Sequence, residues 1–546
     1  MHLGQFLRFT SRRVLLSAVD AIVTNPVIRW TWTGPGNEEI MGTLPEFRPT
    51  DRETVLEMMQ GRYLLSSRLI DTQGDSPFSI EAHHADWVDE LNSFAWLRHF
   101  RDARTEEERR FARVLTLDWI DRGGRFNRTN WQLSLTARRI LNWLRHYSIL
   151  MEGADPGEAQ RINRSLATQI SSLKLRGPLA LEPVDALLVA IALLGVAVCA
   201  DRPESEVLGR IRAVQRLLDQ QIDDDGLHRS RSARTQVKLL VELTTVRQVL
   251  LRHYESFAVE LTELTELMQR ALDAISLGTG EPGYFNGTGQ MAHDILVAVQ
   301  AQSASRARAS CVVGGYGRLI TGRSIVVADS GLVPEAEFAG LAHAGALAFE
   351  FSHGRDLVVC NCGPAPTGYD DPLLFRQGIA HSAPTINALS SAHLVAHGPM
   401  AGRLTQMGAA NTVEARTDED MLVLRAHGYT DKFHVVLQRS LTLLAEGKTL
   451  VGQDRFLPQR NRISGSAAIR FHLAHQTEVQ VGDEIVRMRL ASGAIWTFLW
   501  EGASMHIEDS VRHSAYFGLH RTRQIVLEAP VAAAGEISWI FTLEEA

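Results

Sequence analysis

The hydrophobic pattern of this chain changes its period once, between residues 280 and 311. Before residue 280, apolar side chains recur at three- and four-residue steps, as Leu133, Ala137 and Ile140 do, which predicts amphipathic helices. After residue 311 the apolar runs are short, rich in β-branched and aromatic residues, and separated by Gly, Asp, Ser and Asn, which predicts antiparallel strands. Because helices and sheets bury their apolar faces differently, the chain is predicted to be a multidomain α+β protein.

The length of 546 residues also exceeds what one hydrophobic core usually supports. Amphipathic helices without a sheet to cover must bury their faces against one another, so residues 1–290 are predicted to form a helical domain, with roughly 1–80 as an N-terminal extension. Residues 291–546 are predicted to form a large antiparallel β-sandwich. The glycine-rich segment GTGEPGYFNGTG, residues 278–289, precedes the change of pattern and is the expected hinge.

Composition and charge narrow the class of protein. The formal net charge of −7 gives no overall attraction to polyanions, so no nucleic-acid partner is predicted. Four cysteines do not form the pattern of a secreted disulfide framework. The apolar run Leu187–Ala200 is about 14 residues long, whereas a membrane span needs roughly 20, so a buried helix is predicted there.

The N-terminal sequence MHLGQFLRFTSRRVLLSAVDAIV contains basic residues but no apolar core followed by a small-residue cleavage site. We therefore predict a cytoplasmic location, with a periplasmic one as the alternative. Oligomeric state is left open by the sequence.

The stretch AHAGALAFEFSHGRDLVVCNCG, residues 342–363, predicts a hairpin. ALAFEF is typical of a strand, His353-Gly354 of a tight turn, and Leu357–Cys360 of a returning strand. His343 stands just ahead of the first strand, among Ala and Gly residues that leave room around an imidazole.

Together with GGYGRLITGRSIVVADSG, residues 314–331, this stretch resembles the heparinase II/III-like polysaccharide lyases, which include alginate and oligoalginate lyases. The resemblance covers roughly residues 80–546 and is strongest over 223–234, 280–294 and 314–391. It implies an incomplete (α/α) toroid followed by a large antiparallel β-sandwich, with the active site in the cleft between them. The implied reaction is β-elimination of a uronic-acid polysaccharide, and the implied partner is therefore an acidic polysaccharide or oligosaccharide.

That reaction sets chemical requirements. The enzyme removes the C5 proton beside a carboxylate and expels the O4-linked sugar. A base must take the proton, an acid must protonate the leaving oxygen, and donors or cations must stabilise the enolate-like charge. Tyr and His side chains in a locally basic groove are the expected groups.

His228 matches a cleft histidine of the family in DDDGLHRSRSARTQVKLL, residues 223–240, although the family's accompanying Asn is absent. The resemblance implies that His228 binds the C5 carboxylate or acts as the base. Arg231, Arg234 and Lys238 are spaced to share one face of a helix, and Arg231 and Arg234 are predicted to bind substrate. Solvated surface arginines are the alternative.

Tyr284 in GEPGYFNGTG stands where the family places a catalytic tyrosine, and Asn286 is a candidate donor to the substrate carboxylate. Tyr369 is a second catalytic or stacking candidate in a loop rich in Pro and Gly, and Arg376 is placed to pair with a uronate. For both tyrosines, the alternative is an aromatic that anchors a loop.

A reduced metal site is implied by three further matches. His343 and His381 correspond to family histidines, and Asn361 stands where relatives place an Asp ligand. Zinc prefers three or four N, S or carboxylate ligands, so this set is poor unless Cys360 or Cys362 substitutes. We therefore expect that no cofactor is required, with a structural zinc ion as the open alternative.

In the helical half, Trp143 and Arg139 lie one helical turn apart in TNWQLSLTARRILNW and resemble the family's Trp/Arg helix beside the substrate groove. They are predicted to bind substrate, and a structural Trp with a snorkelling Arg is the alternative.

Two other functions remain open. The substituted motif positions also fit a catalytically reduced glycan-binding or scaffold protein. A glycoside hydrolase needs two carboxylates that flank the scissile bond, and the cluster Asp223–Asp225 is more simply explained as a partner for a helix N-terminus.

Overall fold

The computed structural model describes residues 3–25, 40–81, 84–252, 254–303, 307, 309–416, 420–460, 465–515, 518–531 and 535–544. The chain divides into two compact units that interleave along the sequence. A helical unit comprises Met1–Ile222, Val237–Glu266 and Ala292–Ser303, and a sheet unit comprises Asp223–Gln236, Leu267–Met291 and Ala304–Ala546. The sequence pattern predicts a single boundary between the two domains, at residues 290 and 291. In the structure, two segments from the predicted helical domain, Asp223–Gln236 and Leu267–Met291, belong to the sheet unit.

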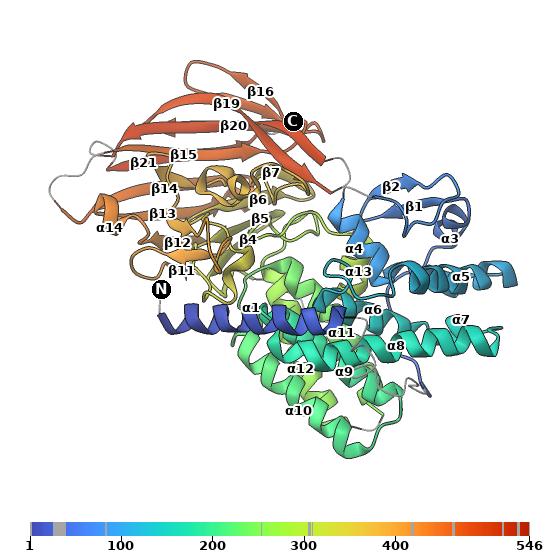
Figure 1. Ribbon diagram of the computed structural model, residues 1–546. Helices are drawn as coiled ribbons and strands as arrows, with labels where there is room; N and C mark the ends of the chain where they lie inside the picture. Colours follow the sequence, from blue (N-terminus) through green and yellow to red (C-terminus); the bar gives the residue numbers. More distant parts are fainter. Residues whose placement is uncertain are drawn as a thin grey trace. The chain divides into compact units, whose positions relative to one another are not determined.

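The helical unit contains α-helices joined mostly by short loops (Figure 1). They are α1 (Leu3–Thr24), α3 (Arg52–Met59), α4 (Ala85–Ser93), α5 (Glu106–Arg122), α6 (Leu133–Arg145), α7 (Tyr147–Met151), α8 (Pro156–Arg176), α9 (Pro183–Cys199), α10 (Glu204–Gln221) and α13 (His293–Gln300), with 3₁₀ helices η1 (Ala95–Asp102) and η2 (Gly177–Leu179). Two more, α11 (Ala233–Leu250) and α12 (Glu255–Ala274), have residues in both units. A hairpin of β1 (Arg62–Leu65) and β2 (Arg68–Asp71), which the sequence pattern did not predict, also belongs to this unit.

Helix α9 confirms the prediction of a buried apolar helix. Leu187, Ile191 and Leu194 are fully buried, and the helix packs against α6 and α10. Among the described residues, none of the helices combines the length and apolar character needed to cross a membrane. Capping fixes where helices begin: at α8, Asp155 and Glu158 form a reciprocal capping box.

The sheet unit contains two large antiparallel sheets. The eight-stranded sheet has the order β11-β12-β13-β14-β21-β18-β17-β16, and the nine-stranded sheet has the order β19-β20-β15-β7-β6-β5-β4-β3 with β8 paired to β15. The strands are β3 (Cys311–Val313), β4 (Tyr316–Thr321), β5 (Ser324–Asp329), β6 (Phe349–His353), β7 (Asp356–Cys360), β8 (Pro384–Ile386), β11 (Thr412–Arg416), β12 (Met421–Ala426), β13 (Val435–Leu444), β14 (Thr449–Pro458), β15 (Ser466–Leu473), β16 (Glu478–Val481), β17 (Val486–Arg489), β18 (Ile495–Glu501), β19 (Ser504–Ser514), β20 (Gly518–Pro530) and β21 (Glu536–Leu543).

Smaller elements of this unit are the β9 (Ala392–Leu394) and β10 (Leu404–Gln406) pair, α14 (Thr430–Phe433), and 3₁₀ helices η3 (Ala339–Leu341), η4 (Pro372–Arg376), η5 (Gly378–Ala380) and η7 (Ala445–Gly447).

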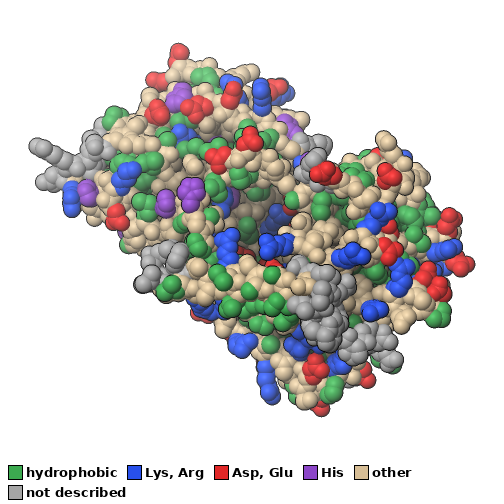
Figure 2. All heavy atoms as spheres, viewed as in Figure 1, with side chains coloured by type: hydrophobic (Ala, Val, Ile, Leu, Met, Phe, Trp, Pro, Cys, Tyr) green, Lys and Arg blue, Asp and Glu red, His purple; other side chains and the backbone are tan. Residues whose placement is uncertain are grey.

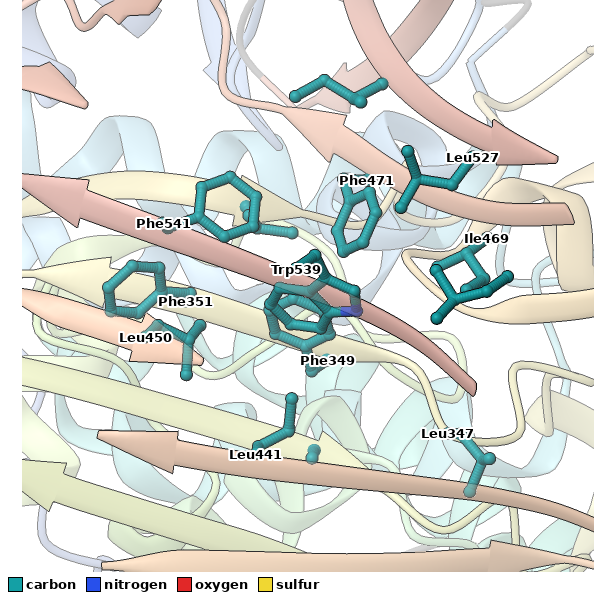
Figure 3. Packing of buried hydrophobic residues seen from close by; sticks show 14 of the residues in the cluster. Leu347, Phe349, Phe351, Leu441, Leu450, Ile469, Phe471, Leu527, Trp539 and Phe541 are labelled. Carbon is teal, nitrogen blue, oxygen red and sulfur yellow. The ribbon is translucent and has the colours of Figure 1, made fainter. Parts of the chain in front are cut away.

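Aromatic side chains of both sheets meet in one core (Figure 3). Phe349 on β6 stacks on Trp539 on β21, with ring centroids 5.5 Å apart and an interplanar angle of 11°. Phe471 on β15 lies edge-on to the same indole at 4.8 Å. Because β6 and β15 belong to one sheet and β21 to the other, these contacts join the two layers into a sandwich.

The predicted hairpin at 342–363 is confirmed as β6 and β7, which pair antiparallel around a turn at Gly354. Side chains alternate between the faces of a strand. Phe349 and Phe351 join the core between the sheets, so the intervening Glu350 is directed to the other face of the strand, where it is completely buried.

Candidate active site

The site is built on the glycine-rich segment 278–289, which belongs to the sheet unit. A Cβ atom at Gly283 would lie only 2.5 Å from the ring of Phe285. Gly287 adopts a φ of 73°, in the left-handed region that favours glycine. The glycines therefore permit the tight loop that carries Tyr284.

Tyr284 stacks against an arginine from the far end of the chain. The guanidinium carbon of Arg512, on β19, lies 4.4 Å from the centroid of the Tyr284 ring. Burial raises the pKa of the Tyr284 phenol above its ordinary value, and the nearby Arg512 charge opposes that rise. The phenol is therefore protonated at neutral pH and suited to donate a proton.

Tyr284 and Arg512 line a pocket of about 300 Å³ within the sheet unit. The pocket combines acidic, basic and amide groups with a few apolar ones. Its lining residues are Leu277, Thr279, Glu281, Pro282, Tyr284, Gln290, Glu350, Leu357, His475, Arg512, His513, Ser514 and His520.

Arg512 is the cation of this pocket. Its Nε is buried and has no hydrogen-bond partner among the described residues, and within that part of the chain Arg512 forms no ion pair. Its charge interacts with the thiol of Cys360, the phenol of Tyr284 and the carboxyl groups of Glu350 and Glu281, which together raise the pKa of Arg512 against the effect of burial. An anionic ligand would therefore find a guanidinium that the described protein groups leave without a carboxylate in contact.

Glu350 is a buried carboxyl that holds the loop in place. Its two carboxylate oxygens accept hydrogen bonds from the backbone N–H groups of Asn361, at 2.7 Å, and Tyr284, at 3.0 Å. Burial raises the pKa of Glu350 to about 7, although Arg512 and these two bonds act in the opposite direction. The Glu350 carboxyl that holds the Tyr284 backbone N–H therefore gains or loses its proton near neutral pH.

Three histidines complete the pocket. The rings of His475 and His520 lie with their centroids 4.0 Å apart, and the backbone N–H of His513 donates to the carbonyl of Cys362. Burial, together with the charges of His475 and Arg512, lowers the pKa of His520. A lowered pKa keeps that imidazole neutral at neutral pH, which is the form that accepts a proton.

His343 and His381 form a directed chain of hydrogen bonds. The Gly287 N–H donates to Nε2 of His343, whose Nδ1 lies 3.0 Å from Nε2 of His381. Nδ1 of His381 lies 2.8 Å from the carbonyl of Gln377, which can only accept. The proton order is therefore fixed, with both rings neutral, and burial lowers the pKa of His343 well below its usual range and that of His381 to about 4.

In this series of hydrogen bonds, each of the four ring nitrogens of His343 and His381 already has a partner. The side chain of Asn361 is also engaged, since its Oδ1 accepts from the Ser382 N–H at 2.9 Å. Cys360 and Cys362 are buried thiols, and burial raises the pKa of each to about 12. Among the described residues, no three His, Cys, Asp or Glu side chains are grouped as metal ligands.

His228 lies outside the lining of the Tyr284 pocket. Its Nδ1 accepts from the backbone N–H of Ser230 at 3.1 Å, and its ring lies edge-on to Phe338. Burial lowers the pKa of His228 to about 3, so the ring is neutral and carries its proton on Nε2. With Nδ1 occupied, His228 is suited to donate a hydrogen bond rather than to act as the base.

Arg231 does not lie on a helix face, which corrects the expectation drawn from its spacing to Arg234. Helix α11 begins only at Ala233, and Arg231 adopts a left-handed φ of 59° in the preceding turn. Its guanidinium donates to Asp329, at 2.7 Å, and to two backbone carbonyls, and it lies over the Tyr316 ring. Arg231 thus ties the turn to β5.

Asn286 completes the same network. Its Nδ2 donates to the Tyr316 hydroxyl and to Asp329, and its Oδ1 accepts from the His343 N–H at 2.9 Å. Its amide is fully bonded within the protein, so binding a substrate carboxylate would require exchange of these bonds. Arg234, by contrast, is half-buried on α11.

Arg376 and Tyr369 lie in the loop region before β8. The Arg376 guanidinium donates to the carbonyls of Ala342, Ala339 and Gly402, so it holds two backbone segments together. Tyr369 is 41% exposed and lies edge-on to a phenylalanine, Phe375. Neither residue lines the Tyr284 pocket.

Arg139 and Trp143 are fully buried inside the helical unit. The Arg139 guanidinium lies 4.4 Å from the Trp119 ring centroid and donates to the Gln169 side chain and to the carbonyl of Asn92. Trp143 lies edge-on to Trp119. This burial favours the structural alternative for both residues.

Sequence reasoning missed Glu350, Arg512, His513 and His520 as pocket residues. One signal was available for Glu350: it is the only charged residue in the otherwise apolar strand ALAFEF. No local signal was available for the other three, because they lie more than 220 positions from Tyr284 in the sequence and meet it only in the folded protein.

The comparisons with known proteins agree with this architecture. Residues 303–540 match the family model described as Heparinase II/III-like, C-terminal. Over 97% of its length the chain is 25% identical to FtsZ-localized protein C of Caulobacter vibrioides (strain NA1000 / CB15N), of which the match covers 96%.

Two solved structures share the fold. One is a heparinase III, with a TM-score of 0.68, 12% identity, and coverage of 97% of this chain and 89% of that chain. The other is the heparan sulfate lyase HepC from Pedobacter heparinus, with a TM-score of 0.60, 15% identity, and coverage of 97% and 88%. The predicted fold class, an incomplete (α/α) toroid followed by a large antiparallel β-sandwich, is confirmed.

Proposed function

We propose that this chain is a polysaccharide lyase, because residues 303–540 match the family model described as Heparinase II/III-like, C-terminal. Its substrate would be a uronic-acid-containing glycan, cleaved by β-elimination. The observation that carries the proposal is the Tyr284–Arg512 pair at the wall of the 300 Å³ pocket. The pair would offer one sugar ring a protonated phenol and a cation that forms no ion pair within the described residues.

The roles follow from the charge of each group. Arg512 would bind the C5 carboxylate and offset the charge that develops when the C5 proton leaves. His520, kept neutral by its lowered pKa, would accept that proton. Tyr284, kept protonated by its raised pKa, would donate to the departing O4 oxygen.

The earlier candidates take supporting roles in this proposal. The His343–His381 pair and Asn286 would hold the Tyr284 loop, and His228 would lie outside the pocket that this loop lines. No step depends on a metal ion.

The test is a panel of alginate, glucuronan, heparan, hyaluronan and bacterial exopolysaccharides. β-Elimination creates a 4,5-unsaturated uronate, so ultraviolet absorbance rises with wild-type protein. At a fixed, low glycan concentration, Tyr284→Phe and Arg512→Gln should each slow the rise strongly, while Tyr63→Phe, which alters a buried tyrosine of the helical unit, should not. Absence of product from every glycan would overturn the proposal.

A second candidate is a catalytically reduced glycan-binding or scaffold protein. It is favoured by the match to FtsZ-localized protein C over nearly the whole of both chains, and by the internal bonding of Arg231 and Asn286. On this alternative the protein would localise with FtsZ and bind glycan without cleaving it. Glycan binding by calorimetry without new absorbance would support it.

The same experiment distinguishes a glycoside hydrolase from a lyase. Asp223 and Asp225 accept backbone hydrogen bonds that hold a turn, but Glu281 and Glu350 both line the pocket. New reducing ends without absorbance would indicate that two carboxylates act there.

A further inference from the structure

Helix α1 has apolar side chains on two faces. On the first face, Phe9, Leu16 and Val19 are half-buried and Val23 is buried, and the helix packs against α8 inside the helical unit. Asp20 continues this face and pairs with Arg176 of α8 at 2.7 Å. This face accounts for the docking of the helix.

The second face is exposed. It carries what we call the α1 stripe, four large apolar residues that share one side of the helix, two of them adjacent in the sequence. They are Leu7, Val14, Leu15 and Ile22, which are 57%, 63%, 53% and 47% exposed. Hydrophobic side chains gather over the position of α1 in Figure 2, which has the same view as Figure 1.

Single exposed leucines are common on protein surfaces, but a row of them along one helix marks an interaction site. Ser11 and Ala18 are also exposed between them, so only small side chains interrupt the stripe. Within the described residues, nothing covers it.

The exposed charged side chains of α1 have one sign. Arg8 and Arg13 are exposed on α1 and form no ion pair within the described part of the chain. The one acidic residue of α1, Asp20, lies on the docked face and is paired with Arg176. The exposed side of this helix is therefore apolar and basic, although the whole chain has a net charge of −7.

From this pattern we propose that α1 binds the surface of an anionic lipid bilayer. An amphipathic helix with an apolar face and flanking Arg residues lies in the plane of the interface, with the apolar face at the boundary between headgroups and acyl chains. The α1 stripe would enter that boundary, and Arg8 and Arg13 would contact lipid phosphates. The helix would lie on the membrane, because none of the described helices can span one.

The experiment is co-sedimentation of the full chain with vesicles of phosphatidylglycerol and phosphatidylcholine, compared with vesicles of phosphatidylcholine alone. Wild-type protein should bind the anionic vesicles, and binding should weaken as salt is added. Leu15→Glu should lower the partition coefficient about tenfold, because a charge then replaces an inserted apolar group. Arg13→Glu should lower it in the anionic vesicles only.

Matched controls keep the test specific. Leu69→Glu alters a residue of the β1–β2 hairpin that is 59% exposed, and Arg110→Glu alters an exposed arginine of α5. Both should bind like wild type, and circular dichroism should show that all four variants fold.

Three results would overturn the proposal. One is the absence of vesicle binding by wild-type protein, and another is binding that Leu15→Glu leaves unchanged. The third is self-association, measured by ultracentrifugation, that Leu15→Glu abolishes in protein that does not bind vesicles, since the stripe would then be a contact between two copies. None of these readouts depends on glycan cleavage.

Discussion

The guanidinium of Arg512 lies over the phenol ring of Tyr284, 4.4 Å from its centroid, although 228 positions separate the two residues. The loop before α13 supplies the phenol and the end of β19 supplies the cation. Glu350 fixes the loop from beneath by accepting the Tyr284 N–H. This pair is the basis of the first prediction.

Replacing the two members of the pair should affect catalysis differently. Tyr284→Phe should lower kcat about 100-fold or more, because it removes the proton donor and little else. Arg512→Gln should chiefly raise KM, because the substrate carboxylate loses its cation. Initial rates of absorbance increase at varied glycan concentration measure both, and equal effects on kcat and KM from either variant would contradict these roles.

Glu350 should make stability depend on pH. Its pKa is raised from 4.5 to about 7 in the folded protein, so the folded state holds a proton that the unfolded state releases. The stabilisation is complete below about pH 4.5 and is lost as the pH rises through about 7, with a total on the order of 3 kcal/mol. Denaturant unfolding at several pH values should show this decline in wild type and a flatter dependence in Glu350→Gln. Parallel curves for the two proteins would mean that the carboxyl is not the group responsible.

The hydrogen-bonded pair of His343 and His381 should make the thermal stability of the protein independent of zinc. Because all four ring nitrogens are engaged, adding Zn²⁺ or a chelator should leave Tm unchanged. His343→Ala should lower the free energy of unfolding by about 2 kcal/mol, because the Gly287 N–H and His381 Nε2 lose their partner. Thermal scans test both statements, and a fall in Tm on chelation would show that a metal ion is bound.

Arg139 should contribute to stability rather than to substrate binding. Its removal leaves buried acceptors on Gln169 and Asn92 without donors, so Arg139→Met should cost about 3 kcal/mol of unfolding free energy. The neighbouring Arg138→Met is the control, since the Arg138 side chain makes no hydrogen bond within the described residues. If Arg139→Met instead raised KM at unchanged stability, Arg139 would be a substrate ligand.

Much of the fold was predictable because its cause is local. The run Leu187–Ala200 is apolar on every face, so it had to be a buried helix, and α9 is one. The alternation in ALAFEF and the turn at His353-Gly354 likewise predicted β6 and β7. Arg231 shows where local spacing fails: a charged side chain gains more from Asp329 and two carbonyls than from one further helical turn.

The candidate site was predictable only in part. Tyr284 was identified because glycines surround it, and glycine-rich loops allow close approach of a ligand. His228 and His343 were identified because histidine can act in catalysis. The residue type alone does not say whether a ring nitrogen faces a pocket or accepts from a backbone N–H. In both cases, burial and a nearby donor decide the answer.

The sequence alone determined the two kinds of secondary structure and where they change, because hydrophobic period acts over a few residues. Only the tertiary structure decided which charged groups contact Tyr284, which face of α1 is left exposed, and which imidazoles form hydrogen bonds inside the protein. These outcomes depend on contacts between segments far apart in the chain, such as β19 and the Tyr284 loop, and no local pattern specifies such contacts.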